Sequence, residues 1–219
     1  MKNFKSLKRV YILLLITIST QTAKADSWLE PSIKIYHSKN KHYMLVVTPA
    51  VVPVNYGLWK DYTSEQKNPS KKFNRRKNKF LKSITPNDTI KKPCIAILYK
   101  LSNTDTILIW EKTLLNEVCP VDVIVANDGL SIATFDNWFS KGHGENVFTV
   151  YNNKGNVYAK YRLKDISPIN ISNYLTSVSS INWYKNAHYI SNDRLVITFI
   201  CADKNEIQRV YNIETLSFE

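Results

Sequence analysis

The densest group of chemically capable side chains in this sequence lies between Thr134 and Asn146. A carboxylate, an amide and an indole are followed by a histidine between Gly142 and Gly144, and then by a second carboxylate and a second amide. Glycines let the backbone approach a ligand closely, and polar groups beside them can orient it. We therefore predict a ligand-binding loop lined by Asp136, Asn137, Trp138, His143, Glu145 and Asn146.

The same loop also suits a purely structural interpretation. Asp136 and Asn137 could form an Asx turn, Trp138 could pack over a sheet edge, and the glycines could simply shape a long hairpin. Replacement of His143 and Asp136 by Ala separates the two interpretations, because a ligand site predicts lost binding without lost stability.

Catalysis has weaker support than binding in this sequence. Ser179 or Ser180 could join His143 and Asp136 in a triad, but no G-x-S-x-G elbow is present. The acidic and amide side chains at 136–146 could supply oxygen ligands to calcium, but their spacing is not that of a calcium-binding loop. The histidines are scattered without an H-E-x-x-H pattern, and they are His37, His42, His143 and His188. A hydrolase that uses residues 134–146 is an alternative, and we expect no metal or cofactor.

A second candidate surface is the basic segment, which we define as residues 67–92. It holds ten Lys or Arg and one acid, a local charge of +9. Between Pro69 and Pro86, apolar residues recur at helical spacing, which predicts a helix over 70–85. Such a helix could bind an anionic membrane surface, or it could be a solvated insertion between two strands. The predicted anion contacts are Lys71, Lys72, Arg75, Arg76, Lys79 and Lys82.

The first 25 residues predict a destination for the protein. Basic residues at positions 2, 5, 8 and 9 precede the apolar run 10–18, and Ala23-Lys24-Ala25 follows. These are the parts of a secretory signal peptide, and about ten apolar residues are too few to cross a bilayer. We expect cleavage after Ala25, a secreted or periplasmic location, and a single domain over 26–219.

The basicity of the chain belongs to one segment. The formal charge is +12, and five of the thirty Lys and Arg lie in the predicted signal peptide, so residues 26–219 carry 25 basic and 18 acidic side chains. Because the basic segment alone carries +9, the rest is slightly acidic, and nucleic acid is not an expected partner. The cysteines Cys94, Cys119 and Cys201 form no C-x-x-C pair, so a Cys94–Cys119 bridge and three free thiols both remain open.

Outside the basic segment the pattern is β throughout. Short runs of β-branched and aromatic residues alternate with turn residues, and the connections 102–105, 127–129 and 152–156 suit hairpins. This predicts an all-β fold of antiparallel meanders. The expected strands are 33–36, 42–48, 94–101, 106–110, 121–126, 130–135, 146–152, 156–163, 194–201 and 207–212.

A weak repeat suggests how the sheets are built. Asn-Asp, then Thr-Phe, then Val-Tyr-Asn occur in this order from Asn127 and again from Asn192. A third copy would combine residues 40–47 with residues 98–99, and the basic segment would then be an insertion between them. The order resembles a β-propeller blade, and 194 residues would supply roughly four blades. A two-sheet sandwich with the same hairpins remains open.

Five blocks form a further pattern, and they are Asp26-Ser27-Trp28, 36–40, Trp110 with Leu115-Asn116-Glu117, 127–138 and 177–183. This pattern resembles that of a group of uncharacterised secreted bacterial proteins, most specifically in T-F-D-N-W at 134–138 and S-V-S-S-I-N-W at 177–183. No activity is assigned to that group, so the resemblance implies a related fold and no mechanism. The chain departs from it at His143, where a Tyr is expected, and in the basic segment.

These patterns together favour a protein that acts by binding. Trp138 and Trp183 lie near loops, where Trp is a typical contact residue for proteins or glycans. We therefore predict a secreted or periplasmic β-domain that binds an envelope protein or a glycan. Association with an anionic membrane through 70–85 and hydrolysis through 134–146 are the alternatives.

Overall fold

The computed structural model describes residues 29–52, 70–83, 92–177 and 179–219. The predicted signal peptide, and residues 67–69 and 84–91 of the basic segment, lie outside these described residues. Within them the chain forms three four-stranded antiparallel sheets, one two-stranded hairpin and three short or medium helices.

We call the three four-stranded sheets sheet 1, sheet 2 and sheet 3 in chain order. Each is a meander in which neighbouring strands follow one another along the sequence. Sheet 1 contains β1 (Lys34–His37), β2 (Tyr43–Thr48), β3 (Ile95–Leu101) and β4 (Thr106–Thr113). Sheet 2 contains β5 (Asp122–Val125), β6 (Ser131–Phe135), β7 (Phe148–Asn152) and β8 (Val157–Tyr161). Sheet 3 contains β11 (Tyr184–Tyr189), β12 (Arg194–Ile200), β13 (Glu206–Asn212) and β14 (Ser217–Phe218).

The remaining elements are small or peripheral. The hairpin pairs β9 with β10, and the helices are α3 in the basic segment, α4 after β8, and a 3-10 turn, η2, before β9. Their bounds are β9 (Leu175–Thr176), β10 (Ile181–Asn182), α3 (Lys71–Ser83), α4 (Leu163–Ile166) and η2 (Ile171–Asn173).

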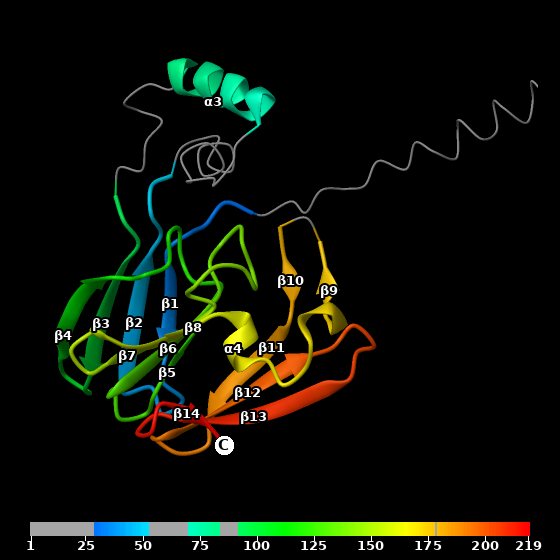
Figure 1. The fold of residues 1–219 in the computed structure, drawn as a ribbon. Coiled ribbons are helices and arrows are strands. Elements are labelled where there is room, and N and C mark those ends of the chain that lie inside the picture. The colour runs from blue at the N-terminus through cyan, green and yellow to red at the C-terminus, as the bar shows by residue number, and fades with distance from the viewer. Residues whose placement is uncertain (1–28, 53–69, 84–91, 178) are drawn as a thin grey trace, which may run out of the picture.

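Sheet 2 is the middle layer of the fold. Along β6, Ile132 points into a cluster shared with sheet 1, whereas Ala133 and Phe135 point into a cluster shared with sheet 3. Alternate side chains of a strand lie on opposite faces, so a sheet covered on both sides has no exposed position, and every residue of β6 is buried. The first strand of sheet 2, β5, contacts the first strands β1 and β11 of the other two sheets. The three sheets therefore meet along their first strands (Figure 1).

The prediction of an all-β fold built from antiparallel meanders is confirmed. The Thr-Phe pairs of the repeat lie in β6 and β12, the second strands of sheets 2 and 3, and the Val-Tyr-Asn triplets lie in β7 and β13, the third strands. Sheet 1 has the same meander, with β2 paired to β3 across the long connection that contains α3, but its strands lack the Thr-Phe and Val-Tyr-Asn sequences. The repeat therefore marks equivalent strands of blade-like sheets.

A helix forms where the basic segment predicts one. The hydroxyl of Ser70 accepts a hydrogen bond from the backbone N–H of Phe73, 3.1 Å away, and so caps the first turn of α3. No residue of α3 is buried, and Figure 1 shows the helix apart from the three sheets. Phe73, Lys77 and Phe80 lie on one side of the helix and are half-buried, whereas the other residues of α3 are exposed.

Candidate functional site

The predicted ligand-binding loop connects β6 to β7, the two central strands of sheet 2. It starts with a sharp reversal, because Asp136 adopts a left-handed backbone with φ of 57°. This conformation is uncommon for a residue with a side chain, and Asp is among the residues that tolerate it. The backbone N–H of Asp136 donates to the carbonyl of Val147 at 2.7 Å, which closes the loop at its base.

The carboxylate of Asp136 is completely buried beneath this loop. It accepts hydrogen bonds from the backbone N–H of Gly142 at 2.6 Å and from the indole Nε1–H of Trp183 at 3.0 and 3.1 Å. Burial raises the pKa of Asp136 to about 7, against the opposing effects of these two donors and of the Lys141 ammonium. Asp136 thus ties the loop to sheet 3.

Lys141 strengthens the same junction. Its ammonium donates to Oδ1 of Asn182 at 3.0 Å and to the carbonyl of Tyr184 at 3.3 Å. Burial lowers the pKa of Lys141, and the nearby Asp136 opposes that shift. The carbonyl of Lys141 also accepts from the N–H of Ile181 at 2.9 Å, so the loop pairs with the start of β10.

Asn137 and Trp138 connect the loop to other parts of the chain. The side-chain oxygen of Asn137 accepts from the N–H of Val118 at 3.1 Å, and Asn137 is nearly buried. The indole N–H of Trp138 donates to the carbonyl of Leu29 at 2.9 Å, and the Lys34 ammonium lies 4.6 Å from the centre of its ring. Both side chains therefore contribute to packing between segments.

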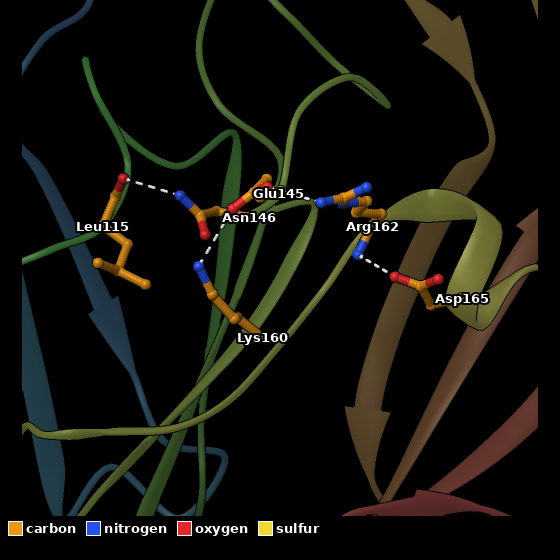
Figure 2. A network of polar contacts seen from close by, with 6 residues as sticks. All are labelled: Leu115, Glu145, Asn146, Lys160, Arg162 and Asp165. Carbon is orange, nitrogen blue, oxygen red and sulfur yellow. Dashed lines mark hydrogen bonds and ion pairs between the residues drawn. The ribbon is translucent and has the colours of Figure 1, made fainter.

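Glu145 belongs to a polar network at the surface, which Figure 2 shows. Its carboxylate pairs with Lys160 at 3.3 Å and with Arg162 at 2.6 Å. Hydrogen bonds from Lys160 and Arg162 lower the pKa of Glu145. The carboxylate of Asp165 accepts from the backbone N–H of Arg162 at 3.1 Å, so the network joins the loop, β8 and the first turn of α4.

The last two predicted site residues, Asn146 and His143, have different surroundings. The amide of Asn146 donates to the carbonyl of Leu115 at 3.2 Å (Figure 2). His143 is exposed, and its backbone N–H donates to the carbonyl of Ser140 at 3.1 Å. The six predicted residues thus share one loop but face different surroundings: Asp136 and Asn137 point into the protein, whereas His143 and Glu145 lie on its surface.

Two residues that hold this site were not among the predicted ones. Trp183 donates to Asp136 from 47 residues away in the chain, and Lys141, which lies in the same loop as Asp136, donates to Asn182 and Tyr184 of the later segment. Trp183 ends one of the two specific motifs of the resemblance, T-F-D-N-W and S-V-S-S-I-N-W. In this structure the two segments meet, since the Asp of the first accepts a hydrogen bond from the final Trp of the second.

The basic helix forms a separate candidate surface on α3. All six cations predicted to contact an anion are exposed, and the helix contains no acidic residue. The ion pairs found between described residues involve other side chains. The exposed cations of α3, which we call the cationic face, are Lys71, Lys72, Arg75, Arg76, Lys79 and Lys82.

Comparison with known proteins and with general site criteria adds little to this geometry. The sequence matches no model of a protein family and no curated protein. The resemblance to secreted bacterial proteins therefore stays a prediction. Within the described part of the chain, no three His, Cys, Asp or Glu side chains are grouped as a metal site requires. No helix formed by the described residues has the length and apolarity to cross a membrane.

Proposed function

We propose that this protein is a secreted or periplasmic β-domain that acts by binding, and that α3 is its contact with an anionic membrane surface. The observation that supports this most is the cationic face: six exposed Lys and Arg within the thirteen residues of α3, with no acid among them. The signal-peptide pattern supports an envelope location, where such surfaces occur.

The expected strength follows from the charges. A Lys or Arg near an anionic bilayer contributes about 1 kcal/mol of binding free energy. Six such residues on one exposed helix therefore suffice for reversible binding without insertion of an apolar anchor. Because exposed charges are screened within about 10 Å at 0.1 M salt and about 3 Å at 1 M, this binding must weaken steeply with ionic strength.

Protein or glycan recognition by the 134–146 loop is the second candidate. Exposure of His143, Gly144 and Glu145 at its tip favours it, because these residues are accessible to a macromolecule. A hydrolytic role for this loop has less support, since the carboxylate of Asp136 is buried and already accepts two N–H donors.

Sedimentation with vesicles tests the membrane proposal. The purified protein is mixed with vesicles of neutral phosphatidylcholine, with or without anionic phosphatidylglycerol, and the bound fraction is measured. We expect binding only with the anionic lipid and its loss when the cationic face is changed to Gln.

A matched control separates the helix from overall charge. It changes six exposed lysines elsewhere to Gln, so the net charge falls equally, and circular dichroism verifies the fold of both variants. Binding that survives in the α3 variant, or that falls equally in both, would contradict the proposal. The control residues are Lys39, Lys100, Lys112, Lys154, Lys164 and Lys204.

A further inference from the structure

The outer edge of sheet 1 differs from the other sheet edges. β4 is the longest strand, with eight residues, and it pairs with β3 on one side only. Among the described residues, no strand pairs with its other side. A strand at a sheet edge presents a row of free backbone N–H and C=O groups, which is a template for another strand.

The side chains of β4 make this edge apolar as well as long. Seven of its eight residues are exposed, and only Trp110 is buried. Ile107, Leu108 and Ile109 follow one another and are 52%, 55% and 41% exposed. Three consecutive exposed aliphatic residues on an edge are unusual in a soluble protein unless something covers them.

The other two sheets end in edges that discourage pairing. β14 has only two residues, so it offers little backbone to a partner. β8 has five residues and carries Lys160, whose ammonium pairs with Glu145 beside the strand. Short strands, edge lysines and bulges are the usual protections against edge-to-edge association, and along its apolar half β4 has only the last of these, at Ile109, where the register with β3 shifts.

The face of sheet 1 that points away from sheet 2 continues this apolar surface. The side chains that point away from sheet 2 are aliphatic or aromatic over most of the four strands, whereas the exposed side chains of β11 and β13 in sheet 3 are polar. The apolar residues on this face are Ile35, Met44, Val46, Ile95, Ile97, Tyr99, Leu101 and Leu108.

We propose that β4 is a self-association site, at which β4 of a second copy pairs antiparallel across a two-fold axis. The two copies of sheet 1 then form one continuous eight-stranded sheet. Backbone groups of both edges become paired, and the aliphatic stretch of each strand lies against that of the other.

The charges of β4 fit a second copy of the same strand. Glu111 and Lys112 lie together near one end, whereas the other end, Thr106 and Ile107, is uncharged. In an antiparallel pairing centred between Leu108 and Ile109, Glu111 faces Thr106 of the second copy and Lys112 faces Asp105, which directly precedes β4, so opposite charges meet and like charges do not. A parallel pairing would place Glu111 beside its own copy.

The contact predicts a dimer that dissociates on dilution. It is one strand wide and eight residues long, about 26 Å at 3.3 Å per residue, so it buries less than the roughly 800 Å² per partner of a stable interface. The dimer would also carry two copies of α3, because this helix lies in the connection between β2 and β3 of the same sheet. The inference nevertheless stands without the membrane proposal.

Two measurements on the purified protein test this inference. Sedimentation velocity over a range of concentrations reports the oligomeric state, and hydrogen–deuterium exchange at low and high concentration reports which amides become protected. We expect a monomer–dimer equilibrium with new protection in β4 and none in β8 or β14. Ile109→Lys should raise the dissociation constant at least tenfold.

Val157→Lys is the matched control, since Val157 lies on the edge strand β8 and is 42% exposed, against 41% for Ile109. Its dissociation constant should equal that of the unchanged protein. A monomer at every concentration would overturn self-association and leave the edge to a strand of another protein. A dimer whose protected amides lie outside β4 would overturn the site. Neither result depends on whether the Ile109→Lys variant folds.

Discussion

Replacement of Asp136 by Asn tests the role of the buried carboxylate through the pH dependence of stability. The pKa of Asp136 is about 7 in the folded protein, mainly because of burial, and about 3.9 for an unfolded Asp. Between these values the folded state holds a proton that the unfolded state has lost. The free energy of unfolding must therefore fall as pH rises from about 4 to 7, and it levels off above 7.

The size of the fall follows from the two pKa values. Between pH 5 and pH 8 this difference in proton binding lowers the free energy of unfolding by about 2.5 kcal/mol, at 1.36 kcal/mol per pKa unit. For a protein of this length, this corresponds to a decrease in Tm of roughly 5–10 °C. Two titratable groups interact electrostatically with Asp136. They are the Lys141 ammonium, whose pKa is lowered by burial, and the Tyr184 hydroxyl, whose pKa is raised by burial. Tyr184 therefore stays neutral in this range.

Thermal unfolding at pH 5 and pH 8 provides the assay. The unchanged protein should be less stable at pH 8, and Asp136→Asn should lose most of that difference because Asn does not titrate. Asp193→Asn is the control, since Asp193 is half-buried at the surface and its pKa is lowered by the Ser191 hydroxyl, so the fall in stability should persist. An equal fall in the Asp136→Asn variant, or a protein more stable at pH 8, would refute the reasoning.

Three further predictions concern the same loop. Trp183→Phe removes the indole donor from the buried carboxylate, so denaturant unfolding should show a loss of about 2 kcal/mol or more, and an unchanged midpoint would contradict this role. Gly142→Ala should cost at least about 1 kcal/mol more than Gly144→Ala, because both have positive φ but only at Gly142 would a β-carbon meet another side chain, at 2.7 Å. Glu145→Gln should leave Tm nearly unchanged, because its ion pairs are half-exposed, and a large decrease would show that the surface network holds the loop.

Local patterns in the sequence predict much of this fold. All ten expected strands are present, because alternating β-branched and aromatic residues and Asn-Gly-rich turns act over short distances. The strands that were missed are β9, β10, β11 and β14. Three of these have only two residues, and β11, with the sequence YKNAHY, has Lys, Asn and His at three of its six positions, so no apolar alternation marks it.

The candidate site was only partly predictable for a different reason. The loop itself stands out by composition, but the burial of Asp136 depends on Trp183, which is 47 residues away in the chain. A sequence shows that a carboxylate lies at the end of a strand, and not which side of the sheet a later segment will cover. The same limit applies to Glu145, whose partners Lys160 and Arg162 come from the far end of the next hairpin.

The salt dependence of binding to anionic vesicles is the most direct test of the central proposal. The bound fraction of the unchanged protein and of the variant without the cationic face is measured from low salt to 1 M, with phosphatidylglycerol vesicles. We predict strong binding at low salt that disappears by 1 M for the unchanged protein, and weak binding at every salt concentration for the variant. Binding that is insensitive to salt, or equal in the two proteins, would contradict the assignment of α3 as the membrane contact.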